Sequence, residues 1–283
     1  MNSEELIRLQ TALLALGHEP GMIDGLLGPK TIAAAARFMW LDHGDLSVAR
    51  AAYDRLRPTA APDITISGID VSSYQGTVDW KRVAEAGHRF AWVKCSEGTT
   101  HKNKGRQARM DGARAFGIPV GGYHYALPKT YRSIGLKDAV KEANNFLSCY
   151  GTPQPDDLVP ALDLESGLIK GAANHNYNVE WSLKWCEVVG KELGCTPIIY
   201  TARWATQSRI IKADKSLLDE LAKFPLWWAE YRAGSTKEPR KNKAPWKSWD
   251  VWQWTGSGTV PGVKGKCDVN RMRASTLEGL KIS

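Results

Sequence analysis

The sequence predicts two parts: a small all-α domain, followed by an α/β barrel whose eight strands close on one another. Three observations support this. Residues 1–57 show helical spacing, residues 58–66 have linker composition, and residues 67–283 alternate between strand-like and helical stretches. Of the 283 residues, 43% are hydrophobic and 24% charged. This composition is typical of globular proteins and disfavours disordered or fibrous classes.

The first part predicts three short helices. Its first helical apolar face is kept by Leu6, Leu9, Leu13 and Leu16. Gly17 ends that helix, and Pro29 suits the first turn of a second one, which runs to about Trp40. A third helix covers residues 46–56. The Pro- and Ala-rich segment 58–63 then indicates a linker.

This part also resembles the peptidoglycan-binding domain of many cell-wall hydrolases, over about residues 3–56. The matching residues are Leu9-Gln10, Leu13, Leu16-Gly17, Gly21, Asp24-Gly25, Gly28-Pro29-Lys30-Thr31 and Ala34. The resemblance implies that residues 1–57 bind the bacterial wall. The residues alone also allow a plain three-helix bundle without a ligand.

Eight strand-like runs follow the linker. They lie at residues 66–71, 90–95, 118–125, 158–164, 197–201, 225–231, 249–254 and 267–270. Helical stretches fall between the first six runs, at residues 78–86, 104–116, 134–149, 178–193 and 216–223. The last two gaps show no helical periodicity. The pattern predicts an irregular eight-stranded TIM-like barrel with five helices, (βα)5β3.

Acidic residues fall where strands end. Asp70 ends the first strand, Asp163 and Glu165 the fourth and Glu230 the sixth, while Glu97 follows the second and Asp268 belongs to the eighth. In such barrels the reacting groups sit at the C-terminal ends of strands. Carboxylates that share one mouth repel one another, so at least one is expected to hold a proton near neutral pH, as a general acid must.

The pair Asp163-x-Glu165 is the most informative of these. Residues two apart on a strand face the same side, about 6.5 Å apart along the chain. The strand around the pair is apolar, which argues against two exposed loop carboxylates. Glu165 is longer and nearer the strand end, so we expect it to protonate a glycosidic oxygen, with Asp163 stabilising positive charge or orienting the substrate.

Aromatic side chains at or near strand ends are candidates for stacking against sugar rings. These are Tyr74, Tyr123, Tyr125, Tyr200, Trp228 and Trp254. Packing in the barrel is the alternative use of any one of them. His124 lies between two tyrosines and could help set the acid centre, but a single strand histidine is as often structural.

Residues 68–283 resemble a lysozyme of glycoside hydrolase family 25, an N-acetylmuramidase. The matching pieces are Gly68-Ile69-Asp70, Ser73–Gly76, Lys94–Gly98, Gly121, Tyr123–Tyr125, Asp163–Glu165, Ile199-Tyr200, Leu226–Ala229, Tyr231, Trp252–Trp254 and Asp268–Asn270. The resemblance implies cleavage of the β-1,4 bond between N-acetylmuramic acid and N-acetylglucosamine. It also implies Glu165 as acid/base, an acidic centre completed by Asp163, Asp70 and Asp268, and substrate contacts from Glu97 and Gln253.

The route of the reaction stays open at this stage. A retaining enzyme with a carboxylate nucleophile, an inverting enzyme and a substrate-assisted enzyme are all compatible with the spacing. Because Asp-x-Glu resembles family 18 enzymes, in which the substrate acetamide is the nucleophile, we favour the third route. The rival functions are another glycosidase, such as a chitinase, and a non-catalytic wall-binding protein.

The net charge and the absence of certain motifs indicate which partners and cofactors to expect. The net charge is +8, although residues 1–67 hold six basic and eight acidic residues, so the basic excess lies in the barrel and suits an anionic partner. We expect that partner to be peptidoglycan, not nucleic acid. There is no HExxH, P-loop or GxGxxG pattern, so no metal or cofactor is expected.

The cysteines and the start of the chain indicate where the protein is made. The five scattered cysteines suit free thiols in a reducing cytosol. No membrane span or signal segment is visible. We therefore expect a monomeric bacteriophage endolysin, made in the host cytoplasm and acting on the wall after release.

Overall fold

The computed structural model describes residues 10, 31, 34, 65–129, 134–231, 238–240 and 243–282. The chain divides into two compact units, Met1–Ile64 and Thr65–Ser283. The predicted helical domain at 1–57 lies outside the described residues except for three helical positions. Two of these interact, because Gln10 Nε2 donates to Thr31 Oγ1 at 3.1 Å. Of the predicted linker, residues 65 and 66 belong to the first strand of the barrel.

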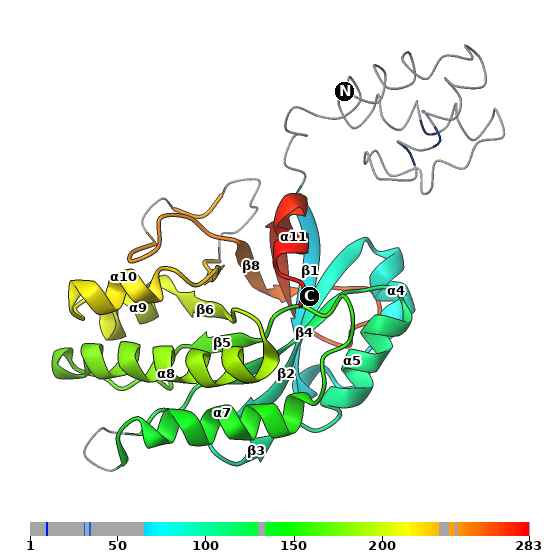
Figure 1. The fold of residues 1–283 in the computed structure, drawn as a ribbon. Coiled ribbons are helices and arrows are strands. Elements are labelled where there is room, and N and C mark those ends of the chain that lie inside the picture. The colour runs from blue at the N-terminus through cyan, green and yellow to red at the C-terminus, as the bar shows by residue number, and fades with distance from the viewer. Residues whose placement is uncertain are drawn as a thin grey trace, which may run out of the picture. The chain divides into compact units, whose positions relative to one another are not determined.

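The second unit is a closed eight-stranded barrel, as predicted (Figure 1). Its strands are β1 (Thr65–Val71), β2 (His88–Glu97), β4 (Val120–Tyr125), β5 (Ala161–Leu164), β6 (Ile198–Ala202), β7 (Leu226–Ala229), β8 (Val251–Gly258) and β9 (Cys267–Arg273). The two-residue strand β3 (His101–Lys102) pairs only with β2. Parallel pairing of β1 with β2 closes the barrel.

The direction of β9 departs from the regular pattern. Strands β1 to β8 of the barrel are parallel, whereas β9 pairs antiparallel with both β8 and β1. Its first residues therefore lie at the same end of the barrel as the last residues of the other strands. Antiparallel neighbours can be joined by a short connection, which explains why no helix is needed between β8 and β9.

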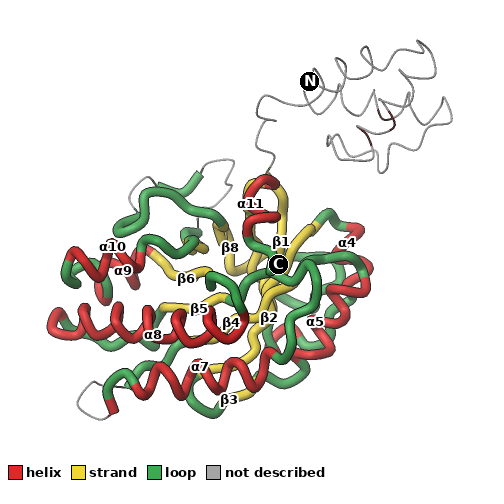
Figure 2. The backbone as a smooth tube through the Cα atoms, in the orientation of Figure 1, coloured by secondary structure: helices red, strands yellow, loops and turns green. Residues whose placement is uncertain are grey.

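Helices cover the outside of the strands (Figure 2). The five predicted helices are present as α4 (Trp80–Glu85), α5 (Arg106–Ala115), α7 (Lys137–Tyr150), α8 (His175–Leu193) and α10 (Lys215–Leu221). The structure adds α9 (Arg203–Arg209), α11 (Ala274–Gly279) and the 3-10 turns η1 (Ser73–Gln75) and η2 (Ala172–Asn174). Local signals set the ends: Asp79 caps α4 by accepting from the Arg82 amide at 3.2 Å, and Gly194 ends α8 in the left-handed region.

The apolar core has two layers, one inside the barrel and one between strands and helices. The inner layer includes Phe90, Trp92, Ala161, Ile198, Tyr200, Trp227 and Met272. The outer layer includes Val93, Leu162, Ile199, Trp228 and the helix residues Phe146, Trp181 and Trp185. Because side chains alternate along a strand, this division fixes which residues point into the barrel. Gly121 leaves the inner space to Trp92, since a Cβ there would lie 2.4 Å from the indole nitrogen.

Candidate active site

Four carboxyl groups meet at one end of the barrel. Asp70 lies near the end of β1, Asp163 in β5, Glu165 directly after β5 and Asp268 near the start of β9. Together with aromatic and amide side chains they line a pocket of about 110 Å³. The other lining residues are Tyr123, Tyr200, Trp227, Tyr231 and Gln253. The four carboxyl groups predicted from the sequence thus share one pocket, which we call the catalytic pocket.

Asp163 and Glu165 share the inner face of β5, as the alternation of the strand predicts. Ala161 belongs to the inner core layer, while Leu162 and Leu164 belong to the outer one. Asp163 is buried, and its Oδ1 has no hydrogen-bond partner among the described residues. Burial, and then repulsion from Glu165, raise the pKa of Asp163 well above its ordinary value.

Glu165 is less buried than Asp163 and has both acidic and cationic neighbours. Burial is the largest cause that raises its pKa, and repulsion from Asp268 adds to it. A hydrogen bond from Tyr200 and the nearby charge of Lys94 act in the opposite direction. The carboxyl group therefore favours its protonated form more than a free glutamate does, which suits a general acid.

Asp70 is held by two amide donors. Gln253 Nε2 and Asn270 Nδ2 both donate to Asp70 Oδ2, at 2.9 Å and 2.8 Å. Burial and repulsion from Asp268, its cross-strand neighbour, nevertheless raise the pKa of Asp70 well above its ordinary value. Burial also raises the pKa of Asp268. Asp268 reaches the pocket because β9 runs antiparallel.

Lys94 is a cation of this site that the site prediction did not include. Its ammonium group lies 2.7 Å from Glu97 Oε2 and 4.7 Å from the centre of the Tyr125 ring. It also lowers the pKa of both Asp163 and Glu165 by its charge. Lys94 pairs with Tyr123 across the β2–β4 register, so the inward orientation of Tyr123 could have indicated it. Glu97 acts here as the partner of this lysine and does not line the catalytic pocket.

His124 lies outside the catalytic pocket, in the layer between β4 and the helices. It is fully buried, with Nδ1 2.7 Å from Ser96 Oγ and Nε2 2.9 Å from Glu142 Oε2. Its ring stacks on Trp185. Burial lowers the pKa of His124 to about 3 and raises that of Glu142 to about 8. The sequence left open whether His124 helps to set the acid centre or is structural. Its buried position supports the structural role.

The remaining predicted sugar contacts divide by strand face. Tyr123 and Tyr200 line the pocket. Trp228 is fully buried in the outer layer, and Trp254 lies on the outer face of β8 with Arg271 4.8 Å from its ring centre. Tyr74 lies in η1 and is 92% exposed.

Two other strand-end residues are engaged with protein groups. The hydroxyl of Tyr125 contacts that of Ser166. Glu230 is not among the residues that line the catalytic pocket. It accepts from Trp228 Nε1 at 3.1 Å and pairs with Arg240 at 3.2 Å.

Trp227 and Tyr231 line the catalytic pocket, although the site prediction did not include them. Trp227 Nε1 donates to Asn270 Oδ1 at 2.8 Å, and the Tyr231 hydroxyl donates to Gln253 Oε1 at the same distance. The signal for Trp227 is its register with Tyr200 on the neighbouring strand, since paired residues point to the same face. Trp228 is one residue further and points to the helices.

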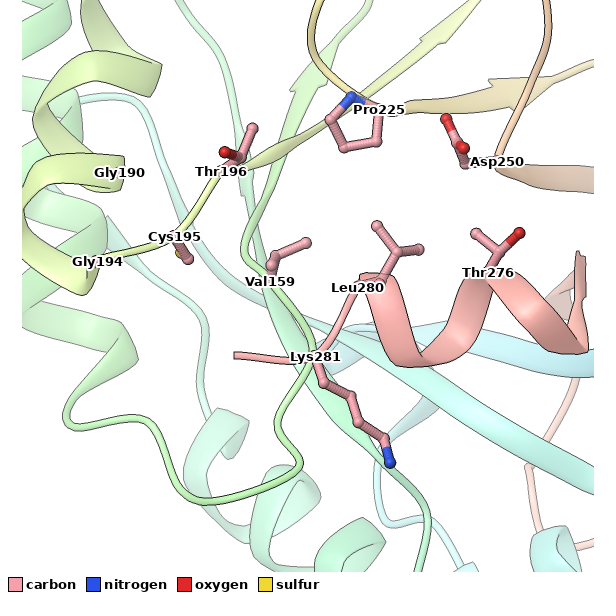
Figure 3. Close-up of a pocket in the computed structure, with 11 residues that line it drawn as sticks. Val159, Gly190, Gly194, Cys195, Thr196, Pro225, Asp250, Thr276, Leu280 and Lys281 are labelled. Atoms are coloured by element: carbon pink, nitrogen blue, oxygen red, sulfur yellow. The ribbon is translucent and has the colours of Figure 1, made fainter. Parts of the chain in front are cut away.

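A larger cavity of about 730 Å³ lies at the opposite end of the barrel (Figure 3). Thr196, Pro225 and Asp250 border it, just before β6, β7 and β8 begin. Asp250 accepts from the Leu226 amide at 2.8 Å, and burial raises the pKa of the Cys195 thiol to about 11. Among the described residues that line this cavity, Asp250 is the only carboxyl group, so the catalytic pocket is the better candidate despite its smaller volume.

In the ranges that the structure describes, no helix is both long enough and apolar enough to cross a membrane. Among the same residues, no group of three or more His, Cys, Asp and Glu side chains could hold a metal ion.

Comparison with known proteins places the barrel in a family. The model of the family described as Glycosyl hydrolases family 25 matches residues 69–263. Lysozyme M1 of Streptomyces globisporus is 27% identical over 220 residues, which is 77% of this chain and 71% of that protein. The autolytic lysozyme of Clostridium acetobutylicum is 27% identical over 214 residues, which is 76% of this chain and 58% of that protein.

Solved structures show the same architecture. The bacterial lysozyme of Streptomyces coelicolor matches with a TM-score of 0.62 and 26% identity, over 79% of this chain and 98% of that one. A family GH25 lysozyme from Aspergillus fumigatus matches with a TM-score of 0.64 and 24% identity, over 78% of this chain and 100% of that one. The part of this chain that these structures cover is about as long as the barrel unit, Thr65–Ser283.

Proposed function

Because the chain belongs to glycosyl hydrolase family 25, we propose that its catalytic pocket cleaves peptidoglycan with Glu165 as the acid/base. The protein is a peptidoglycan hydrolase of the muramidase type, related to lysozymes over most of its barrel. The bond cleaved is the β-1,4 bond between N-acetylmuramic acid and N-acetylglucosamine.

The observation that carries the residue assignment is the shared inner face of Asp163 and Glu165 in a pocket with raised carboxyl pKa values. Glu165 gives its proton to the glycosidic oxygen as the bond to the anomeric carbon breaks. The leaving sugar departs with that proton, and Glu165 is left ionised. Asp70 and Asp268 complete the acidic centre, and the ionised member of this pair stabilises the positive charge that develops on the sugar ring.

Asp163 is proposed to hold the N-acetyl group of the substrate. Its Oδ1 is buried and has no partner among the described residues, so it can accept from the acetamide N–H. That bond favours the ionised form of Asp163 and leaves the shared proton to Glu165. The acetamide oxygen then attacks the anomeric carbon as the leaving group departs. Water later opens this intermediate and returns its proton to Glu165.

The stereochemistry of the product tests this route. Two displacements at one carbon, by acetamide and then by water, retain the configuration. A single displacement by water inverts it. We expect the newly formed reducing sugar to keep the β configuration when it is analysed immediately after cleavage. Net inversion would eliminate the substrate-assisted route and would leave the assignment of Glu165 as the acid in place.

Mass spectrometry of digested sacculi tests the activity itself. We expect fragments whose new reducing end is N-acetylmuramic acid, and no fragments cut in the stem peptides. Purified chitin serves as the parallel substrate. Digestion of chitin without digestion of sacculi would favour the rival chitinase, and binding to sacculi without any cleavage would favour a wall-binding protein.

The wider proposal is a modular endolysin. Residues 1–57 would hold the wall, and the basic barrel would cut it. This is supported by the resemblance of residues 3–56 to a peptidoglycan-binding domain and by the order of the two parts. In this proposal the protein is made in the cytoplasm of the host of a bacteriophage and acts on the wall after release. A tethered enzyme meets its insoluble substrate at a raised local concentration.

A further inference from the structure

A second pocket adjoins the catalytic pocket and has no assigned role. It measures about 440 Å³ and lies between the start of α9 and the end of β7. Glu165, Tyr200 and Tyr231 line both pockets. A polymer bound across Glu165 can therefore extend directly into this second space, which we call the α9 pocket. Helix α9 contributes Arg203, Trp204 and Gln207 to its lining.

Two aromatic rings border the α9 pocket and face solvent. Trp204 is 47% exposed and Tyr231 is 61% exposed. The indole of Trp204 makes no contact with another ring within the described ranges, whereas most tryptophans of the barrel are buried. A single exposed aromatic residue is unremarkable in a globular protein. Two of them on one pocket beside an acidic centre form a surface on which a sugar ring or an apolar chain can stack.

Arg203 supplies the charge of this pocket. It is half-buried, and its guanidinium group has no hydrogen bond or ion pair with any residue that the structure describes. The other arginine of the same helix, Arg209, is used by the fold, because its Nη1 donates to the Leu168 carbonyl at 2.7 Å. A partly buried guanidinium without a partner is suited to bind a carboxylate by two parallel hydrogen bonds.

The acidic residues of the α9 pocket do not cancel this cation. Glu230 is already paired with Arg240 and also accepts from Trp228 Nε1. Glu165 lines both pockets, and burial raises its pKa and favours its uncharged form. A carboxylate that enters the pocket therefore meets Arg203 as an available cation. A neutral sugar offers that guanidinium no charged partner.

From this arrangement, and resting on the proposed function, we infer that the α9 pocket binds a carboxylate-bearing muramyl unit next to the cleaved bond. Arg203 pairs with the carboxylate, and Trp204 stacks on the adjoining sugar ring or chain. In peptidoglycan a carboxylate can come from two sources. One is the lactyl ether of a muramic acid that lacks its peptide, and the other is the stem peptide of a substituted one.

Three glycan substrates separate these sources. The first is strands from which an amidase has removed the peptides, so that the lactyl carboxylates are free. The second is the same strands after chemical conversion of those carboxylates to neutral methylamides. The third is strands that carry intact peptides. Wild-type cleavage of at least one of them tests the proposed function independently of Arg203.

Steady-state kinetics of Arg203→Gln then tests the pocket. We expect kcat/KM to fall about tenfold or more on one carboxylate-bearing substrate, mainly through KM, with no change on the neutral strands. Loss on the free lactyl strands identifies the lactyl source, and loss confined to peptide-bearing strands identifies the peptide. Arg203→Lys should recover part of the loss on the same substrate, because it keeps the charge.

Two further variants complete the design. Trp204→Ala should raise KM on all three substrates, since stacking does not depend on the carboxylate. Arg82→Gln changes an exposed arginine on α4 and should match the wild type throughout. Equal losses by Arg203→Gln on all three substrates, or no loss on any, would overturn the inference while wild-type cleavage upholds the proposed function. If the wild type cleaves none of them, the proposed function fails first.

Discussion

Gln253 and Asp70 are joined by a hydrogen bond of 2.9 Å that links β8 to β1 across the intervening strand β9. The amide of Gln253 has its orientation fixed at both ends. Its Nε2 donates to Asp70, and its Oε1 accepts from the hydroxyls of Tyr200, at 2.9 Å, and Tyr231, at 2.8 Å. One buried side chain thus positions a carboxylate and two tyrosines together.

Replacing Gln253 with leucine should therefore damage the pocket more than a single lost contact would. The Tyr231 hydroxyl loses its acceptor, Tyr200 keeps only its hydrogen bond to Glu165, and Asp70 keeps only Asn270 as a donor from the pair. Each buried group left unsatisfied costs about 1–3 kcal/mol, so we expect a loss of kcat/KM of about tenfold or more on purified peptidoglycan. Gln107→Leu on the exposed face of α5 is the matched control. Wild-type activity in Gln253→Leu would contradict this role.

The charge of Lys94 should set the upper pH limit of activity. Lys94 lowers the pKa of Glu165, and the reaction needs Glu165 protonated. Removing the charge in Lys94→Met raises that pKa further, so the alkaline limb of the kcat/KM profile should move to higher pH. Lys184→Met, which removes a lysine paired with Glu187 on α8, should leave the limb in place. A limb that moves to lower pH in Lys94→Met would refute the assignment.

The buried pair His124–Glu142 should make stability depend on pH. Burial raises the pKa of Glu142 to about 8 from 4.5, so its contribution to stability is complete below pH 4.5 and is lost as pH rises toward 8. The lowered pKa of His124 acts below pH 6.5, where the unfolded chain binds a proton that the folded one does not. Between pH 6.5 and 8 the carboxyl group dominates this pair.

Denaturant unfolding of Glu142→Gln measures that contribution. A glutamine cannot ionise, so the stability of the variant relative to the wild type should rise between pH 6.5 and 8. The slope should approach about 1.4 kcal/mol per pH unit at most. Glu187→Gln on the exposed face of α8 should show no such relative slope. Parallel curves for Glu142→Gln and the wild type would show that Glu142 is ionised in the folded protein.

Deletion of residues 1–57 should separate wall binding from catalysis. If this segment tethers the barrel, activity on whole sacculi should fall clearly, whereas activity on short soluble glycans should change little. The comparison is made as the ratio of the two activities for the shortened and full chains. Equal losses on both substrates would instead indicate that the segment supports folding of the barrel.

The barrel and its acid pair could be predicted because both depend on local periodicity. The alternation around Asp163 and Glu165 is visible in four residues, and the structure has the two on the inner face. It was harder to predict which side chains of β7 point into the barrel. Trp227 and Trp228 are both apolar, and only the pairing of Trp227 with Tyr200 decides which one points inward. The direction of β9, which brings Asp268 to the pocket, is set by pairing with β1 and β8 and leaves no local signal.

Two short helices, α9 and α11, were not predicted from the sequence. Helix α9 has seven residues and α11 has six, and each begins at the residue after a strand ends, so no loop residues mark its start. This is why Arg203 and Trp204, which lie on α9, were not among the predicted site residues. Helices α4 and α10 are equally short, but each is separated from the preceding strand or helix by other residues. Long helices such as α8, with 19 residues, carry enough turns for the period to be read.

The assignment of Glu165 is tested most directly by the turnover of Glu165→Gln on purified sacculi, with wall binding measured in parallel. Glutamine keeps the size of the side chain but has no proton to give at the glycosidic oxygen. General acid catalysis contributes about 10²–10⁴-fold to the rate. Turnover should therefore fall at least about 10²-fold, while wall binding is unchanged. Turnover equal to that of the wild type would contradict the account.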